Sequence, residues 1–383
     1  MADFIEQIRE LDLHLLTKLV RQANQDELLE IRDWQVESLS FLVAMPTTGG
    51  LYRVSGTAQS TGTIKRWSLI CKIVIPNQEG ALTALYYWKR EALVYKSELL
   101  RNLPGELRLP ACYGVCEYPD AEWIWLEEIV ADNEWTLDHY SLAARYLGQF
   151  NGAYINNRVL SDCPWLSQDW LPTKLNAPTS VNQILYDLEQ RNHPLVQRVF
   201  SRIPINRLLD LYRNKDVYLS PLNGLPHTLC HRDFKRDNVL FARHPKGQGK
   251  MVVIDWGFLG NGVLGEDLGH FFASTLFGFQ YQLEDASKLD TLLWENYLAG
   301  LMDTGWRGDP RNVRYSLLVS TVFRWSGLWL DWLPYVLRDD LQEWFEDKYQ
   351  HSIDEIVEQW SGTLVFLLDL VDKMQYPYDP VHD

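Results

Sequence analysis

Cysteine is scarce in this 383-residue chain, and the few cysteines follow neither a disulfide nor a metal pattern. The five thiols (Cys71, Cys112, Cys116, Cys163 and Cys230) are odd in number and scattered, which argues against a disulfide framework. Cys112 and Cys116 have no second ligand pair at zinc-finger spacing, so a zinc site is not expected. Unpaired thiols are typical of a reducing compartment, and we expect a cytoplasmic protein.

Long apolar runs and basic patches are also missing. No run approaches the roughly 18 residues of a membrane span, and the acidic N-terminal residues contain no signal-peptide core. The net charge is −15, and residues 271–383 hold 19 Asp or Glu against 8 Lys or Arg. Such a surface repels nucleic acid and anionic lipid and favours a cationic small molecule, although acidic surfaces also serve solubility. We therefore expect no nucleic-acid partner and no membrane partner.

One segment carries a recognisable arrangement of catalytic residues. It begins at His231 with the triplet His-Arg-Asp, continues to Asn238, and reaches Asp255 17 residues later at the end of an apolar strand. The pattern H-R-D-x-x-x-x-N followed by D-x-G is typical of phosphoryl transfer. Asp233 is placed to accept the proton of an acceptor hydroxyl, while Asn238 and Asp255 offer oxygen ligands to Mg²⁺ on nucleotide phosphates. Their order and spacing make a stronger signal together than any one residue alone.

A lysine upstream fits the same chemistry. Lys72 stands in an apolar strand, and its neighbours on the same face, Ile70 and Val74, are both apolar. A lysine in that setting is expected to have a specific partner. Glu91, 19 residues further along in a predicted helix, would pair with it and leave the ammonium group facing nucleotide phosphates. Glu98 is the competing candidate.

A glycine pair precedes the lysine strand. Residues 47–56 contain Gly49 and Gly50 at the place where a phosphate-covering loop belongs, and glycine lets backbone N–H groups approach phosphate closely. A glycine pair between two strands is more often only a hairpin turn. The position upstream of Lys72 favours the phosphate-binding interpretation.

A second glycine motif is a decoy. Residues 260–265 match G-x-G-x-x-G, the dinucleotide-binding pattern. The glycines do not open a helix directly after a strand, because five residues separate them from Ile254, and no alternation of strands and helices surrounds them. We expect a flexible loop here and no Rossmann fold.

The remaining sequence texture indicates two lobes. Apolar periodicity predicts a helix over residues 3–22, and alternating or apolar runs predict strands, with a helix near 80–100 and mostly helix after 135. The predicted strands are residues 38–43, 51–56, 67–74 and 123–128, and a pair at 238–241 and 251–254. The predicted division is a helical extension (1–34), a sheet-rich nucleotide-binding lobe (35–130) and a helical lobe with the catalytic loop and acceptor site (131–383).

With these residues, the chain resembles the aminoglycoside phosphotransferase and choline kinase family over residues 35–370. The resemblance implies an α+β, protein-kinase-like fold with two lobes, a small antiparallel sheet and a large helical part. It also implies an ATP-dependent, Mg²⁺-requiring kinase that phosphorylates a hydroxyl of a small molecule such as an aminoglycoside, amino alcohol or sugar. Adenine would bind the connector backbone at Glu127 and Ile129. Lys235 is a candidate contact to the transferred phosphoryl group, with a solvated lysine as the alternative.

Two alternatives stay open. The Arg after His231 and the Lys at 235 are typical of protein Ser/Thr kinases, but only 12 residues separate Asp255 from Asp267, which leaves no room for an activation segment. A nucleotide-binding module without catalysis would usually lack the base, a metal ligand or the strand lysine, and all are present. The acceptor site is less defined: a stretch with Trp325, Trp329, Asp331 and Trp332 either lines it or packs in the core.

Overall fold

The chain divides into two compact units in a computed structural model. Unit 1 takes in 1–134, 159–167 and 238–259, and unit 2 takes in 135–158, 168–237 and 260–383. The structure describes residues 4–39, 47–77, 81–84, 86–131, 134–155, 162–168, 170–175, 205–242, 250–336, 338–372 and 374.

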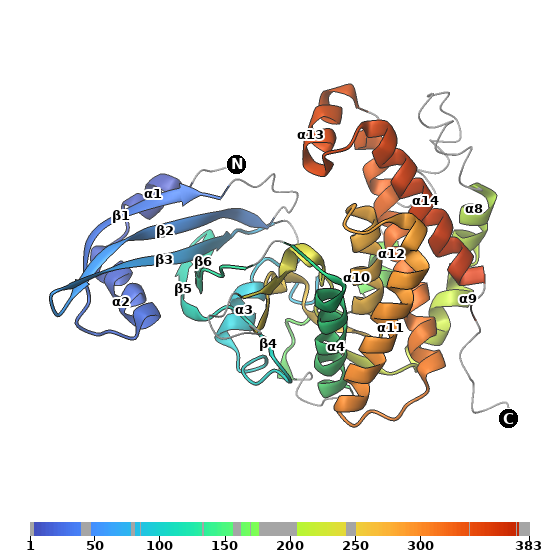
Figure 1. Cartoon of the computed structure of the whole chain (residues 1–383), viewed down its shortest axis with the longest axis horizontal. Coiled ribbons are helices and arrows are strands. Elements are labelled where there is room, and N and C mark those ends of the chain that lie inside the picture. The colour runs from blue at the N-terminus through green and yellow to red at the C-terminus, as the bar shows by residue number, and fades with distance from the viewer. Residues whose placement is uncertain are drawn as a thin grey trace. The chain divides into compact units, whose positions relative to one another are not determined.

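Unit 1 is built on an antiparallel sheet of five strands, which Figure 1 shows as long blue and green arrows. The strand order is β1-β2-β3-β6-β5, so the two hairpins β2–β3 and β5–β6 lie next to each other. Alternation of buried and partly exposed residues along β3 gives the sheet two packed faces. The strands are β1 (Glu30–Ser38), β2 (Thr48–Ser60), β3 (Thr63–Val74), β5 (Cys112–Tyr118) and β6 (Ala121–Glu127).

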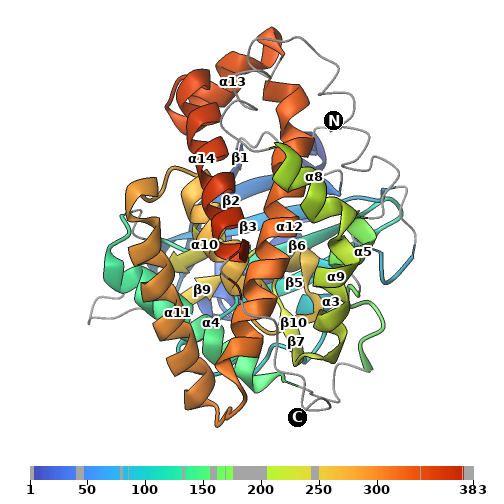
Figure 2. The ribbon, with the colours of Figure 1, turned by 90° about the vertical axis from the view of Figure 1, so that its right-hand side faces the viewer.

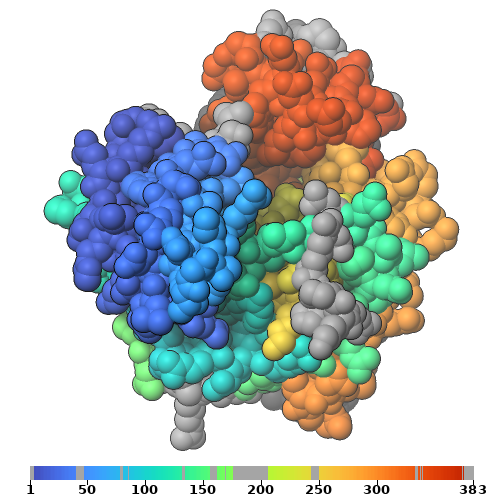
Figure 3. Space-filling model, turned by 60° about the vertical axis from the view of Figure 1, so that its left-hand side comes forward, coloured from blue at the N-terminus to red at the C-terminus, as the bar shows by residue number. Residues whose placement is uncertain are grey.

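Two N-terminal helices cover one face of this sheet, dark blue beside the lighter blue strands in Figure 3. They are α1 (Ile5–Arg9) and α2 (Leu13–Asn24). Leu16 and Leu19 of α2 are buried in one cluster with Trp123 and Trp125 of β6. The single helix expected over 3–22 is therefore wrong in one respect. The helix is interrupted before Asp12. The carboxylate of Asp12 caps the second helix by accepting the N–H of His14 at 3.0 Å.

The opposite face of the sheet carries α3 (Arg90–Lys96). Ala92 of this helix packs with Val74, Ile124 and Leu126 of the sheet. A second, three-stranded sheet completes unit 1, with β9 in the centre between β4 and β8. Its strands are β4 (Leu107–Arg108), β8 (Val239–Phe241) and β9 (Met251–Val253).

Unit 2 is helical, with one antiparallel pair of short strands. Helix α10 is buried along its whole length, and the long helix α12 packs against both α10 and α14 (Figure 2). None of the helices in the described part of the chain combines the length and the apolar composition that a membrane crossing requires. The helices are α4 (Leu137–Ala153), α5 (Trp170–Leu175), α8 (Ile205–Arg213), α9 (Lys215–Leu219), α10 (Glu266–Phe277), α11 (Ala286–Asp303), α12 (Pro310–Val336), α13 (Asp339–Tyr349) and α14 (Ile353–Asp372). The strands are β7 (His227–Cys230) and β10 (Gly260–Val263).

Most predicted elements are confirmed. Besides the split N-terminal helix, two predictions need correction. The strands predicted at 51–56, 67–74 and 123–128 lie in β2, β3 and β6, and the predicted pair after the catalytic loop is β8 and β9. Residues 48–50, expected in a loop, are the start of β2, and the predicted strand at 38–43 lies mostly outside the described residues. The expected flexible loop at 260–265 is instead strand β10, paired antiparallel with β7. The predicted division after residues 34 and 130 stays a prediction.

Helices α4 and α11 approach each other closely because both carry glycine at the contact. A Cβ atom on Gly148 would lie 2.2 Å from the carbonyl oxygen of Tyr297, and one on Gly300 would lie 2.0 Å from that of Arg145. Both obstacles are helix backbone, which cannot move without separating the helices. Only glycine, which has a hydrogen atom in place of a side chain, therefore fits at these two positions.

We predict that Gly300→Ala destabilises the protein despite the better helix propensity of alanine. Overpacking costs about 1–3 kcal/mol, which exceeds the roughly 1 kcal/mol by which alanine favours a helix. Urea unfolding followed by tryptophan fluorescence measures the shift. Gly224→Ala is the control, because nothing lies within 4 Å of a Cβ atom at that position. Equal unfolding midpoints for Gly300→Ala and the parent would contradict the assignment.

Candidate active site

The predicted lysine of β3 forms an ion-pair cluster in unit 1. Lys72 Nζ lies 2.5 Å from Glu91 Oε2 and 2.7 Å from Asp255 Oδ1. This confirms the predicted pair and excludes Glu98, which instead pairs with Arg101 on the surface. The cluster joins three segments that are distant in the sequence: β3, α3 and the turn after β9.

Strand geometry explains the placement of the lysine. Leu69, Cys71 and Ile73 point to the face covered by the N-terminal helices. Lys72 therefore points to the opposite face, where α3 packs, because side chains alternate along a strand. Glu91 lies in the first turn of that helix and is buried, so its carboxylate reaches the ammonium group from the covering layer.

The cluster fixes the charge of the lysine. Burial by itself lowers the pKa of Lys72, but the carboxylates of Asp255 and Glu91 outweigh it and raise the pKa above its ordinary value. Burial raises the pKa of Glu91, and the Lys72 ammonium opposes that shift. Lys72 is therefore a cation at neutral pH, held in place by two carboxylates.

A residue that sequence reasoning missed anchors this cluster. Arg90 is fully buried, and its guanidinium donates to the carbonyl oxygens of Gly257 at 2.9 Å, Trp165 at 2.9 Å and Ala84 at 2.5 Å. It thereby ties the turn that follows Asp255 to the helix that carries Glu91. An arginine beside a glutamate in a surface-like helix pattern gave no signal of this role.

Asn238 and Asp255 sit on neighbouring ends of the β8–β9 hairpin. Val239 pairs with Val253, and the N–H of Ile254 donates to the Asn238 carbonyl at 3.0 Å. Asp255 has a left-handed backbone (φ 64°), which turns its side chain out of the strand.

Asn238 and Asp255 suit a magnesium ion that takes most of its ligands from outside the protein. Among the described residues, no cluster of three or more His, Cys, Asp or Glu side chains could hold a metal by itself. The carboxylate of Asp255 is 39% exposed, so one hard oxygen ligand is open to solvent. Mg²⁺ commonly takes only one or two protein ligands and completes its shell with phosphate oxygens and water. The donor set therefore suits Mg²⁺ carried by a nucleotide.

The other predicted nucleotide contacts lie in unit 1 as well. Gly49 and Gly50 belong to β2, where Gly50 pairs with Ile73 of β3. Glu127 ends β6, and its N–H is already used by the Ala111 carbonyl. Its carboxylate accepts two hydrogen bonds from Arg108, at 2.5 and 2.9 Å. Ile129 follows in irregular backbone.

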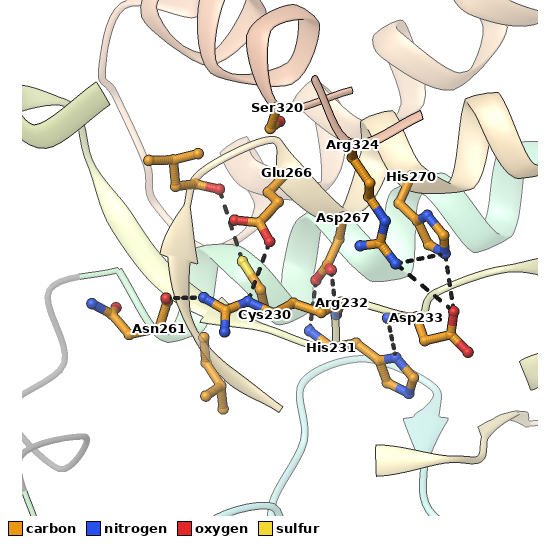
Figure 4. Close-up of polar contacts among 12 residues, drawn as sticks. Cys230, His231, Arg232, Asp233, Asn261, Glu266, Asp267, His270, Ser320 and Arg324 are labelled. Carbon is orange, nitrogen blue, oxygen red and sulfur yellow. Dashed lines mark hydrogen bonds and ion pairs between the residues drawn. The ribbon is translucent and has the colours of Figure 1, made fainter. Parts of the chain in front are cut away.

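Asp233 and Lys235 belong to unit 2, where a buried carboxylate shapes the catalytic loop (Figure 4). Asp267, in the first turn of α10, accepts the backbone N–H of His231 at 2.8 Å and that of Arg232 at 2.7 Å. Asn151 of α4 donates a further hydrogen bond to it at 3.3 Å. Burial, and next the neighbouring Glu266, raise the pKa of Asp267 to about 6. The backbone of the loop is therefore held by a carboxylate that burial has deprived of most of its hydration.

The arginine of the triplet has a structural role. Arg232 is buried with a left-handed backbone (φ 65°), and its Nε donates to Glu266 at 3.2 Å. Its guanidinium also donates to the carbonyl oxygen of Asn261 in β10. Gly262 makes room for Glu266, because a Cβ atom there would lie 2.5 Å from Glu266 Oε2. The glycine motif at 260–265 thus allows the arginine and glutamate to pack.

Three donors surround the carboxylate of Asp233. Lys235 Nζ lies 2.9 Å from Oδ2, His270 Nε2 lies 3.1 Å from Oδ1, and Arg324 Nη2 lies 4.0 Å from Oδ1. Burial opposes ionisation, but Lys235, His270 and Arg324 together hold the pKa of Asp233 well below its ordinary value. Asp233 is an anion at any pH where the protein works.

Sequence reasoning named neither His270 nor Arg324 as functional. His270 follows Asp267 by three residues, a spacing that places both on the same face of α10, so the helix pattern held a usable signal. Burial, and next the Arg324 guanidinium, lower the pKa of His270 to about 3, so its ring is neutral. Since Asp233 is an anion, Nε2 must carry the ring proton and donate it to Oδ1.

The tryptophan stretch of α12 divides between core and site. Trp329 is buried, and Trp332 stacks on Trp344 of α13 at 6.2 Å between ring centroids. Trp325 is different, because its ring stacks on His270 at 5.4 Å. Asp331 pairs with Lys174 of α5 at 3.4 Å.

Comparison with known proteins gives a family match for part of the chain and matches of fold for most of it. A sequence model described as the phosphotransferase enzyme family matches residues 158–298. Comparison with curated proteins finds no match. An aminoglycoside phosphotransferase from Alicyclobacillus acidocaldarius superposes with a TM-score of 0.51 at 14% identity, covering 87% of this chain and 94% of that one. A putative aminoglycoside phosphotransferase from Ralstonia eutropha gives 0.52 at 14% identity, covering 95% and 99%.

The chain has the fold of the aminoglycoside phosphotransferases. An amicoumacin kinase shares it, with a TM-score of 0.50, 17% identity and 98% coverage of both chains. These likenesses confirm the predicted kinase-like α+β fold. The family match, which includes the catalytic loop and Asp255, confirms the predicted resemblance and the predicted class of enzyme, a phosphotransferase.

The neutral His270 of this phosphotransferase predicts a pH dependence of stability. Its pKa is about 3 when folded and about 6.5 when unfolded, so the unfolded state binds the extra proton as the pH falls below 6.5. This histidine alone should cost about 2 kcal/mol of stability between pH 7 and pH 5. Asp267, whose pKa is raised, acts in the opposite direction over the same range.

Comparing variants isolates the histidine. His270→Gln keeps a donor for Asp233 and cannot titrate, so its melting temperature should fall less between pH 7 and pH 5 than that of the parent. The exposed His14→Gln variant on α2 is the control and should behave like the parent. An identical pH dependence for His270→Gln and the parent would overturn the assignment of a buried neutral ring.

Proposed function

We propose that this protein is an ATP-dependent kinase that transfers the γ-phosphate, with Mg²⁺, to a hydroxyl group of a small molecule. We expect it to act in the cytoplasm, in keeping with its free cysteines. The observation that carries the proposal is the cluster that buried Glu91 and largely buried Lys72 form with the partly exposed Asp255. It provides a permanent cation for phosphate oxygens beside an exposed carboxylate suited to the metal.

The nucleotide side of the reaction belongs to unit 1. Lys72 would contact the α- and β-phosphates, and Asn238 and Asp255 would hold Mg²⁺. When bound, Mg²⁺ neutralises charge on the phosphate oxygens. In the absence of nucleotide, Lys72 and Asp255 satisfy each other, so phosphate would take over the ammonium group and free the aspartate for the metal. Gly49, Gly50 and the connector residues Glu127 and Ile129 stay proposed contacts to the nucleotide.

The acceptor side belongs to unit 2. Asp233 would accept a hydrogen bond from the acceptor hydroxyl and take its proton as transfer proceeds. Its depressed pKa makes it a weak base, so its main contribution is to orient the hydroxyl. A loose transition state, in which little negative charge has to leave the oxygen early, is compatible with such a base. Lys235, which pairs with Asp233, would move to the transferred phosphoryl group.

A protein Ser/Thr kinase is the weaker alternative. The ten residues from Trp256 to Gly265 contain a short 3₁₀ turn and strand β10, so no long activation segment can be placed there. A nucleotide-binding module without catalysis is disfavoured because Asp233, Lys72 and Asp255 are all present and charged.

Substituting the Lys72–Glu91 pair or the metal ligand Asp255 should strongly lower or abolish turnover. Lys72→Ala is expected to lower kcat by roughly 10²–10³, the loss seen for one preorganised charge donor. Glu91→Gln should show a smaller loss in the same direction, and Asp255→Ala or excess EDTA should stop turnover. Coupled ADP release measures all four. Full activity in EDTA, or parent-like kcat/KM for ATP in Lys72→Ala, would contradict the site.

The base and the metal ligands should separate experimentally. Asp233 has no metal role in this mechanism, so Asp233→Asn should bind Mg-ATP with nearly the parent affinity by calorimetry. Its transfer rate should fall by roughly 10²–10⁴, the loss expected for a positioned general base. Lost nucleotide binding would move Asp233 into the metal site. Robust labelling of casein or histone by the parent protein would favour the protein-kinase alternative.

A further inference from the structure

One buried cation next to Asp233 is poorly satisfied by the described residues. Arg324 of α12 is only 7% exposed, and its Nε and Nη1 make no hydrogen bond. Its guanidinium lies over the ring of Trp170, with Cζ 4.5 Å from the ring centroid. Burial lowers the pKa of Arg324, which reports the cost of keeping this charge away from water.

The third nitrogen is no better placed. Nη2 lies 3.4 Å from His270 Nε2 and 4.0 Å from Asp233 Oδ1. Since Nε2 carries a proton for Asp233, it has no lone pair to offer Arg324. Figure 4 marks both contacts of Nη2, with His270 and with Asp233. Among the described residues, the guanidinium therefore has only the Asp233 carboxylate as an acceptor, 4.0 Å away and beyond ordinary hydrogen-bond reach.

The neighbours add donors where an acceptor is needed. The indole Nε1 of Trp170, on which the guanidinium stacks, is buried and makes no hydrogen bond. The same holds for Nε1 of Trp325, whose ring stacks on His270. Lys174, four residues after Trp170 on α5, has its pKa lowered by burial, and its carboxylate partner lies 3.4 Å away. Lys174 has Asp331 as an acceptor, and indole N–H groups are also unbonded in the sheet core of unit 1, so the guanidinium of Arg324 is the donor that needs a ligand. A buried cation without an acceptor in hydrogen-bond reach is costly unless a ligand completes it.

We propose that Arg324, with Trp170 and Lys174 around it, binds an anionic oxygen group, a carboxylate or a phosphate, that the acceptor carries close to its reacting hydroxyl. The inference rests on the proposed function for the hydroxyl, which Asp233 orients. Arg324 lies within 4.0 Å of that carboxylate, so one small molecule can engage both residues. A hydroxy acid has the required pair of groups.

The chemistry of the cation favours this ligand over the alternatives. Guanidinium matches carboxylate and phosphate with two parallel hydrogen bonds, and stacking on an indole holds its plane in place. An amine at this position would meet like charges from Arg324 and Lys174. The acidic residues 271–383 favoured a cationic acceptor, but the side chains next to Asp233 select the opposite charge.

Binding can be measured without catalysis. In a thermal-shift titration of the full chain without nucleotide, we expect glycerate or glycerol 3-phosphate to raise the melting temperature, because a ligand that binds only the folded state stabilises it. Glyceramide, glycerol and ethanolamine are matched probes without the anion and should have little effect. The carboxylate and phosphate arms identify which anion is preferred. Equal shifts for glycerate and glyceramide, or a shift with ethanolamine alone, would overturn the proposal.

Variants then separate a ligand-binding arginine from a structural one. Arg324→Met removes a buried, unsatisfied charge, so the unliganded protein should melt at the same or a higher temperature while losing the glycerate response. Arg324→Gln should weaken glycerate binding about 10- to 100-fold, the range of one charged hydrogen bond or two. Arg314→Gln, on the same helix but paired with Asp290, is the control and should keep the response. A destabilised Arg324→Met, or an unchanged glycerate response in it, would show a structural role and refute the proposal.

A turnover assay distinguishes this inference from the proposed function. In coupled ADP release, Arg324→Gln should raise KM for an anionic acceptor at least about tenfold and leave KM for ATP unchanged. If neutral or cationic acceptors are phosphorylated with parent-like KM in Arg324→Gln, the kinase assignment stands and the anion site fails. If no acceptor is phosphorylated but the Arg324-dependent shift by glycerate remains, the anion site stands and the kinase assignment fails.

Discussion

The arrangement of unit 2 depends on the carboxylate of Asp267, which accepts two successive backbone N–H groups of the catalytic loop. Asn151 bonds to the same carboxylate and to the Leu229 carbonyl, and Tyr297 donates to Asn151 at 2.9 Å. This buried chain of hydrogen bonds joins α10, α4, α11 and β7 around one loop. Without it, the left-handed backbone before Asp233 would have no support, and the base would lose its fixed direction.

Unit 1 and unit 2 handle buried charge in different ways. In unit 1, Lys72 is shared between two carboxylates, and buried Arg90 gives its donors to backbone carbonyls. Each of these cations is satisfied by the protein itself. In unit 2, Asp233 is surrounded by donors, and the described residues give Arg324 only the Asp233 carboxylate, 4.0 Å away. In the proposed mechanism, the protein therefore satisfies the cations of the nucleotide side by itself, and a ligand completes the acceptor side.

The abundance of tryptophan has mostly a packing origin. Trp125 and Trp256 are among the largest fully buried side chains, and Trp123 joins the core beneath the N-terminal helices. Trp170 and Trp325 depart from this pattern, since the Arg324 guanidinium lies over the ring of Trp170 and Trp325 stacks on His270. The residue type alone could not separate these two uses, because both bury an indole ring.

The sequence by itself determined the residues whose spacing is set by local structure. Asp233, Asn238 and Asp255 lie on one loop and one hairpin, so their order along the chain was enough to propose their roles, and alternation along a single strand was enough to single out Lys72. Only the tertiary structure decided which distant side chains meet them. Arg324 lies in α12, 91 residues after Asp233 in the sequence. No helix or strand periodicity relates the two positions. The charge of the acceptor site was decided the same way, because a net charge averages over the surface, whereas binding depends on the few groups that folding buries together.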